Sequence, residues 1–249
     1  MDSGEAKTTE NTENMRIAAG GVNVSENIKR VRDAIAEAAI RSGRSPGDVT
    51  LVAAAKTKPA ELVMEAIAAG ADAIGENRVQ EMMAKRGLGA YEGAPLHFIG
   101  RLQSNKAARI VGVCDLIESV SSPALIELIG KTAASRGVTQ NVLLEVNIGK
   151  EPQKAGFAPD RLEEAMELAS RTEGVNVMGL MSVPPLYEQS DRNCNYFEAI
   201  FQLFIDMTGK KYDNVSMRFL SMGMSDSFTE AIFAGSNMVR VGSAIFGAR

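Results

Sequence analysis

The sequence predicts an α/β protein, a single (β/α)8 TIM barrel with an extra helix on its N-terminal side. Eight short apolar segments alternate with amphipathic helical segments along the 249 residues. Such alternation is typical of parallel strands that are covered by crossover helices. Eight strand–helix units within roughly 200 residues favour a closed barrel over an open sheet.

The eight units can be followed along the chain. The predicted strands are LVAAAK (51–56), AIGEN (73–77), LHFIG (96–100), LIESV (116–120), VLLEVNI (142–148), VNVMGLM (175–181), MRFLSMG (217–223) and MVRVGSAIF (238–246). Helices are expected after each of the first seven strands, with starts near Pro59, Ser104, Ser122, Pro159 and Asp226. The helix after the sixth strand presents an apolar side made of Phe197, Ile200, Phe201 and Phe204.

An additional helix is predicted ahead of the barrel, over residues 25–42, with Ser25 as its candidate N-cap. Its apolar side is formed by Ile28, Val31, Ile35 and Ala38. Because no helix is predicted after the eighth strand, we expect this helix to fill the gap in the outer ring. Residues 1–23 are rich in Thr, Asn, Glu and Gly without an apolar period, so we expect a disordered leader or an expression remnant. Residues 24–249 are then the barrel domain.

Composition excludes several classes of function. The formal net charge of −4 gives no electrostatic basis for binding nucleic acid or an anionic membrane. The two cysteines, Cys114 and Cys194, lack metal-site spacing and indicate reduced thiols in a cytoplasmic protein. With a single histidine, His97, the chain offers little material for a histidine metal site or triad. We expect no metal, no signal peptide and no membrane span.

A lysine stands where the first barrel strand ends. Lys56 closes the apolar run LVAAA, and Pro59 then opens a helix. Burial lowers the pKa of a lysine and leaves more of it as the neutral amine, which condenses with an aldehyde. The alternative is a strand-end lysine whose ammonium reaches back to water.

Small and hydroxyl residues follow the last two strands, where TIM barrels often bind phosphate. Gly223, Met224 and Ser225 precede a predicted helix, so backbone N–H groups and a hydroxyl are expected to converge on an anion there. Gly242 and Ser243 form a second such pair. Opposite a lysine, these residues indicate a phosphate-bearing aldehyde as the ligand.

Seven segments, taken in order, resemble a known family. They are AAAKTKP, IGENRVQE, HFIGRLQSNK, VNIGKEPQKAGF, GLMSVPP, SMGMSDSF and MVRVGSAIFGAR. Between Ser25 and Arg249 the chain closely resembles the YggS/PROSC proteins, also called pyridoxal phosphate homeostasis proteins. The resemblance implies a barrel of the alanine racemase N-terminal domain type and pyridoxal 5′-phosphate (PLP) as the cofactor.

The resemblance also implies which residues bind PLP. Lys56 is expected to form the internal aldimine, Arg240 to face the pyridine nitrogen, and Asn77 to lie beside the cofactor. The phosphate is expected to lie against Gly223, Met224, Ser225, Gly242 and Ser243. An arginine stays charged and so disfavours a second positive charge on the ring nitrogen. An unprotonated pyridine is a poorer electron sink, which fits a limited chemical repertoire.

Other polar residues have less specific interpretations. His97 is expected to be a satisfied core or rim histidine, and Glu118 and Glu145 to orient polar groups inside the barrel. The chain departs from the family's commonest pattern at Arg101, at Ser227 and at the segment QKAGF (153–157). All three departures are expected at the mouth of the barrel, where they affect ligand access.

Three functions are compatible with these residues. The first is a non-enzymatic, monomeric protein that holds PLP as a Lys56 aldimine and takes part in vitamin B6 homeostasis, with apo PLP-dependent enzymes as possible partners. The second is a PLP-dependent amino-acid racemase. The resembled racemases take a second base, a tyrosine, from a separate β-domain, and Ala60 stands where they carry another tyrosine near the phosphate. The third is a sugar-phosphate enzyme that uses a lysine.

Overall fold

A computed structural model describes residues 22–183, 185 and 190–247, so the leader predicted over residues 1–23 lies almost entirely outside the described residues. Eight parallel strands form a closed barrel in chain order, which confirms the predicted fold class. The strands are β1 (Thr50–Ala54), β2 (Ala73–Glu76), β3 (Leu96–Phe98), β4 (Leu116–Val120), β5 (Gln140–Glu145), β6 (Val175–Met181), β7 (Val215–Ser221) and β8 (Met238–Val241).

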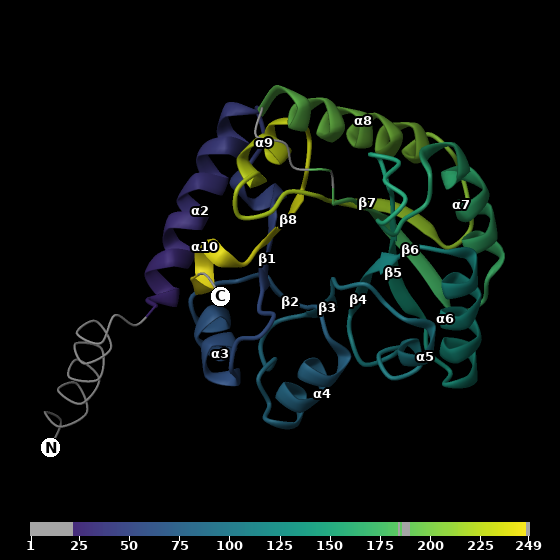
Figure 1. Ribbon diagram of the computed structural model, residues 1–249, viewed down its shortest axis with the longest axis horizontal. Coiled ribbons are helices and arrows are strands. Elements are labelled where there is room, and N and C mark those ends of the chain that lie inside the picture. Colours follow the sequence, from purple (N-terminus) through teal and green to yellow (C-terminus); the bar gives the residue numbers. More distant parts are fainter. Residues whose placement is uncertain (1–21, 184, 186–189, 248–249) are drawn as a thin grey trace, which may run out of the picture.

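Helices surround the barrel (Figure 1). They are α2 (Val24–Arg41), α3 (Ala60–Ala68), α4 (Val79–Gly87), α5 (Ser104–Ala107), α6 (Pro123–Ser135), α7 (Leu162–Arg171), α8 (Ser190–Thr208), α9 (Phe228–Phe233) and α10 (Ser243–Phe246), with 3-10 turns η1 (Pro46–Asp48) and η2 (Pro159–Arg161). Within the described residues, no helix is both long and apolar enough to cross a membrane.

Successive side chains of a barrel strand face the helices and the barrel interior in turn. In β1, Leu51 and Ala53 pack outward in the cluster that includes α2, whereas Val52 packs inward in a cluster with Leu143 and Met238. This interior cluster is small. Toward the carboxyl ends of the strands, the buried polar residues His97, Glu118, Ser221 and Arg240 take the place of further apolar side chains.

Helix α2 fills the gap in the outer ring, as predicted, by packing against α9, α10 and α3 (Figure 1). The four predicted apolar residues of its inner side are all buried. The predicted N-cap is wrong, because Asn23 and not Ser25 takes that position. Asn23 has an extended backbone, and its side-chain oxygen accepts a hydrogen bond from Glu26 N at 2.9 Å. Ser25 lies inside the first turn.

Two predicted boundaries near the carboxyl ends of β7 and β8 are also wrong. The eighth strand ends at Val241 and not at residue 246, because the backbone N–H groups of Gly242 and Ala244 donate to Ser225 Oγ and not to a neighbouring strand. The short helix α10 follows over Ser243–Phe246, where no helix was predicted. Helix α9 begins at Phe228 and not near Asp226. Residues 224–227 form a turn instead, in which Ser227 N donates to the carbonyl oxygen of Met224 at 2.9 Å.

Replacement of the helix cap tests the α2 assignment. Asn23→Ala is expected to lower the free energy of unfolding by about 1 kcal/mol, because a backbone N–H at the helix start loses its acceptor. Ser25→Ala is the matched control and is expected to have a much smaller effect. Chemical denaturation of both variants measures the difference, and equal effects would contradict the assignment.

Candidate functional site

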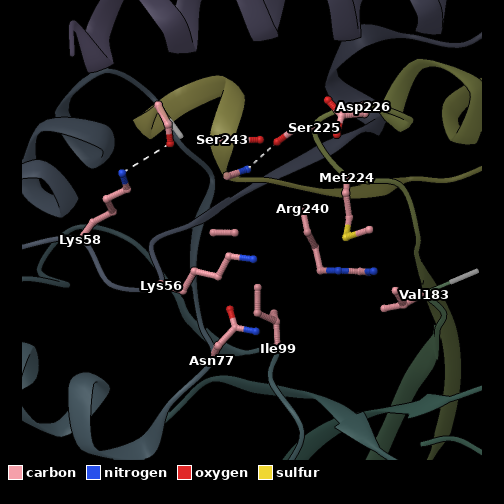
Figure 2. A pocket seen from close by; sticks show the side chains of 13 residues that line it. Lys56, Lys58, Asn77, Ile99, Val183, Met224, Ser225, Asp226, Arg240 and Ser243 are labelled. Carbon is pink, nitrogen blue, oxygen red and sulfur yellow. Dashed lines mark hydrogen bonds between the residues drawn. The ribbon is translucent and has the colours of Figure 1, made fainter. Parts of the chain in front are cut away.

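A cavity of about 420 Å³ opens at the carboxyl ends of the strands (Figure 2). It is lined by Ala54, Lys56, Lys58, Asn77, Ile99, Val183, Met224, Ser225, Asp226, Arg240, Gly242, Ser243 and Gly247. Seven of the eight predicted site residues are among them, and Gly223 is not. The volume lies within the range of small-molecule sites, about 300–1,000 Å³.

Lys56 and Lys58 leave the same turn in different directions (Figure 2). The Lys56 side chain projects into the cavity toward the side that holds Arg240. Lys58 Nζ instead donates to the carbonyl oxygen of Phe246 at 2.8 Å, at the end of α10. The structure therefore directs one amine of this turn to the centre of the cavity and engages the other at its wall.

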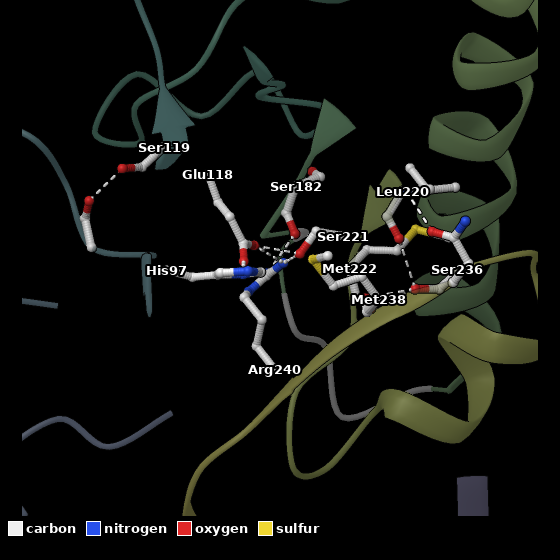
Figure 3. A network of polar contacts seen from close by, with 12 residues as sticks. His97, Glu118, Ser119, Ser182, Leu220, Ser221, Met222, Ser236, Met238 and Arg240 are labelled. Atoms are coloured by element: carbon white, nitrogen blue, oxygen red, sulfur yellow. Dashed lines mark hydrogen bonds and ion pairs between the residues drawn. The ribbon is translucent and has the colours of Figure 1, made fainter. Parts of the chain in front are cut away.

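Arg240 forms the inner end of the cavity. Its side chain comes from β8 and is only 4% exposed. The guanidinium donates to Ser221 Oγ at 2.5 Å and to the carbonyl oxygen of Ser182 at 2.9 Å, and it lies 3.8 Å from Glu118 (Figure 3). Burial lowers the pKa of Arg240, and the charges of Glu118 and Glu145 oppose this shift.

Glu118 compensates the buried charge of Arg240. The carboxylate is fully buried and lies 2.7 Å from His97 Nδ1, and it accepts a hydrogen bond from Ser221 Oγ at 2.6 Å. Burial by itself raises the pKa of Glu118, but the hydrogen bond with His97 and the charge of Arg240 outweigh burial, so the pKa is lowered. The expectation that His97 is a satisfied core histidine is confirmed by this contact.

At Glu145, unlike at Glu118, the effect of burial on the pKa outweighs that of the nearby positive charges. Burial raises its pKa, and the positive charges of Arg240 and Arg101 offset only part of the shift. Glu145 and Arg101 line a second cavity, of about 240 Å³, which shares Asn77, Ile99 and Val183 with the first. The barrel mouth therefore continues beyond the Lys56 cavity.

A hydroxyl and two backbone N–H groups form the opposite end of the cavity. Ser225 Oγ accepts hydrogen bonds from Gly242 N at 3.1 Å and Ala244 N at 3.3 Å, so its own O–H can donate to an anion. A Cβ added at Gly242 would lie 3.2 Å from the carbonyl oxygen of Ala54. Glycine at this position therefore favours the close approach of the chain after β8 to the end of β1.

Gly223 is buried behind the cavity wall. Its φ of +92° is readily adopted only by glycine, and an added Cβ would lie 2.6 Å from the Ala231 side chain. Its carbonyl oxygen accepts a hydrogen bond from Arg240 N at 3.1 Å. Gly223 therefore supports the strand that carries Arg240, and it is not among the residues that line the cavity, whereas it was expected to contact the phosphate.

Asn77, just after β2, contributes an open acceptor. Its side-chain oxygen is buried and has no hydrogen-bond partner among the described residues. A buried polar atom without a partner is costly and is expected to be satisfied by another group. A ligand that donates a hydrogen bond in this cavity would supply the missing partner.

Sequence reasoning missed some residues of the site. Ile99 and Val183 form apolar walls, and both could have been found because Ile99 lies near the end of the third predicted strand and Val183 two residues after the sixth. Among the departures, Arg101 and Gln153 line the second cavity. Ser227 does not lie at the mouth as expected. It is buried, and its hydroxyl accepts a hydrogen bond from Met224 N at 3.2 Å.

Comparisons with known proteins agree with this geometry. The alanine racemase N-terminal domain family matches residues 23–249. The pyridoxal phosphate homeostasis protein of Aquifex aeolicus is 38% identical over 228 residues, which are 92% of this chain and 99% of the relative. The protein of the same name from Escherichia coli K12 is 37% identical over 230 residues, covering 91% of this chain and 97% of the relative.

The chain belongs to the family of pyridoxal phosphate homeostasis proteins.

A solved structure of this family supports the same conclusion. PipY of Synechococcus elongatus, determined with PLP bound, is 31% identical, has a TM-score of 0.78, and matches 90% of this chain and 100% of its own. The predicted family and the predicted barrel type are therefore both confirmed.

The Glu118–Arg240 pair predicts a pH-dependent contribution to stability. Because the pKa of Glu118 is lowered on folding, its ionised carboxylate stabilises the folded protein above the ordinary glutamate pKa of 4.5. This stabilisation is lost as the pH falls through the pKa of Glu118 in the folded protein. Glu118→Gln is expected to be less stable than the wild type at pH 7, with the difference shrinking below pH 4.5. Denaturation at several pH values measures it, with exposed Glu198→Gln as the control. A difference independent of pH would contradict the assignment.

Proposed function

We propose that this protein binds PLP covalently through Lys56 and takes part in intracellular vitamin B6 homeostasis as a holder of the cofactor, without catalytic turnover. The observation that carries the proposal is one cavity that brings together the Lys56 amine, the buried Arg240 guanidinium and the Ser225 hydroxyl. The PLP-bound state of PipY, a relative at 31% identity, supports the choice of ligand.

The residues present fit the groups of PLP. The cofactor supplies an aldehyde that bonds reversibly to amines, together with a phosphate and a hydroxyl. Lys56 provides the amine, the hydroxyl groups of Ser225 and Ser243 provide donors for the phosphate, and Gly242 allows close backbone approach. Arg240 would hold the ring nitrogen without a proton, and Asn77 has the free acceptor that a ligand donor would satisfy.

A racemase is the alternative function. Two-base racemisation needs an acid and a base on opposite sides of the substrate carbon. Among the described residues that line the cavity, the titratable ones are Lys56, Lys58, Asp226 and Arg240. Lys58 is engaged with the carbonyl oxygen of Phe246, and Arg240 is held by Ser221 and Ser182. Asp226 is exposed beside Ser225, at the end of the cavity away from Lys56 (Figure 2). This arrangement favours a holder over a racemase.

Covalent labelling tests the role of Lys56. The protein mixed with PLP is expected to gain an absorption band that borohydride removes, and peptide mapping should find the label on Lys56. Lys56→Ala should lose the label but keep weak, non-covalent binding, since Ser225 and Gly242 remain. Lys106→Ala serves as the control and should label normally. Label on Lys58 or Lys106 with Lys56 unmodified would overturn the assignment, and absence of any band would favour a sugar-phosphate ligand.

Two parallel reactions separate the holder from the racemase. The PLP-loaded protein is incubated with L- or D-alanine in deuterated water, and separately with an apo-aminotransferase. We expect negligible deuterium at the alanine α-carbon and recovery of aminotransferase activity, at a rate limited by release from Lys56. Deuterium incorporation on the scale of turnover would restore the racemase. The Lys56→Ala variant, loaded in the same way, controls for activation by free PLP.

A further inference from the structure

Lys56 lies on a turn that leaves β1 in an unfavourable backbone conformation. Lys58 N donates to the carbonyl oxygen of Ala55 at 3.1 Å, which closes the turn. Its two central residues are Lys56 and Thr57, and Thr57 has a φ of +63°. This left-handed region is sterically unfavourable for a β-branched residue and persists only when the surroundings hold it. The position of Lys56 therefore depends on what holds this turn.

Two side chains of α4 hold the turn from outside. Glu81 accepts a hydrogen bond from Thr57 N at 3.0 Å, and Lys85 Nζ donates to the carbonyl oxygen of Ala55 at 2.9 Å. Residues four apart lie on the same side of a helix, so the two contacts reach the turn together. The Ala55 carbonyl and the Thr57 N–H belong to the two peptide groups that flank the Lys56 Cα atom. Helix α4 therefore grips the backbone on both sides of Lys56.

The Lys85 ammonium is itself held by Glu76, the last residue of β2. Lys85 Nζ lies 2.5 Å from Glu76 Oε1, which also accepts a hydrogen bond from Tyr91 OH at 2.9 Å. The side chains of Lys85 and Glu76 are 9% and 0% exposed. A buried ion pair of this kind adds little stability compared with apolar residues of similar size. Its presence is better explained by the conformation that it specifies.

We propose that Glu81, Lys85 and Glu76, which we call the α4 clamp, are positioning residues that hold the peptide groups on both sides of Lys56 and so aim its amine into the cavity. The proposal rests on the proposed function, because that function gives the amine a reaction to perform. The clamp spans the ends of β1 and β2, and Glu76 directly precedes Asn77, another residue of the cavity lining.

The test compares covalent PLP capture and backbone opening in the full-length chain. Capture is the fraction of Lys56 that borohydride traps at increasing PLP concentration, and opening is amide hydrogen exchange of peptides covering residues 52–60 without PLP. Glu76→Gln/Lys85→Met removes the buried charges together, and Glu81→Ala removes the contact from the exposed side. The control is Arg44→Met, which removes a cationic donor to the Ser236 carbonyl at the opposite end of the barrel.

Each clamp variant is expected to need about tenfold more PLP for half-maximal trapping, the effect of losing one hydrogen bond to a charged group. Faster exchange should be confined to residues 52–60. Arg44→Met should change neither the PLP concentration for half-maximal trapping nor the hydrogen exchange of residues 52–60. Adding Thr57→Gly should recover most of the capture, because glycine adopts the left-handed conformation without steric cost. If the Lys85–Glu76 ion pair only stabilised the fold, Thr57→Gly would not recover PLP capture.

The outcomes distinguish the two proposals. Capture and exchange equal to those of the wild type in the clamp variants would overturn the α4 clamp, as would a loss of capture that Thr57→Gly does not recover. Absence of trapping in the wild type would overturn the proposed function instead. In that case, the hydrogen exchange of residues 52–60 still decides whether α4 holds the turn.

Discussion

The pairing of β1 with β8 is the constraint on which the site depends. The register joins Thr50 to Met238 and Ala53 to Val241, so it brings together segments almost 190 residues apart in the chain. Lys56 follows the first of these strands, whereas Arg240 and Gly242 belong to the second or follow it directly. Closure of the barrel therefore creates the cavity. The outward-facing residues of the same two strands are buried in one cluster with residues of α2.

Buried charged side chains occupy part of the interior of this barrel in place of apolar ones. Arg240 and Glu118 lie where other barrels place layers of branched apolar side chains. A buried guanidinium is tolerated only with nearby negative charge and hydrogen-bond acceptors, and here Glu118, Ser221 and Ser182 supply both. His97 satisfies the other oxygen of Glu118. These residues are therefore better understood as support for Arg240 than as independent functional groups.

The strand pattern alone singled out Lys56, because a charged residue at the end of an apolar strand needs a reason to be buried. Arg240 was expected in the site from the family resemblance, and the structure places both residues in one cavity. Residue type did not decide the placement of Gly223. It was expected to contact the phosphate because it stands beside Met224 and Ser225, but with a φ of +92° it faces α9 and is not among the cavity residues. A glycine suits either placement, so the residue type alone does not distinguish them.

The Lys85–Glu76 pair shows a second limit of sequence reasoning. Lys85 lies on α4 together with the buried residues Val79 and Met82, but a lysine in a short helix is normally assigned to solvent. Helical spacing places Lys85 on the same side as Val79 and Met82, but its partners, the Ala55 carbonyl and Glu76, are tertiary contacts that spacing does not predict. The same limit applies to the cap of α2, where Asn23 and Ser25 are equally acceptable by residue type. Only the direction from which the chain enters the helix distinguishes them.

The two ends of the cavity differ in their access to water, and this difference bears on how a ligand is held and released. Arg240 is buried at the inner end, whereas Ser243 is exposed at the outer end. Hydrogen bonds at the outer end compete with water and so contribute less net free energy than those formed in the interior. In the proposed function, the inner end would orient the ligand, and the outer end would let it leave without an opening of the barrel. A solvent-accessible cavity that offers one amine for a reversible covalent bond is compatible with a protein that holds its cofactor and releases it again.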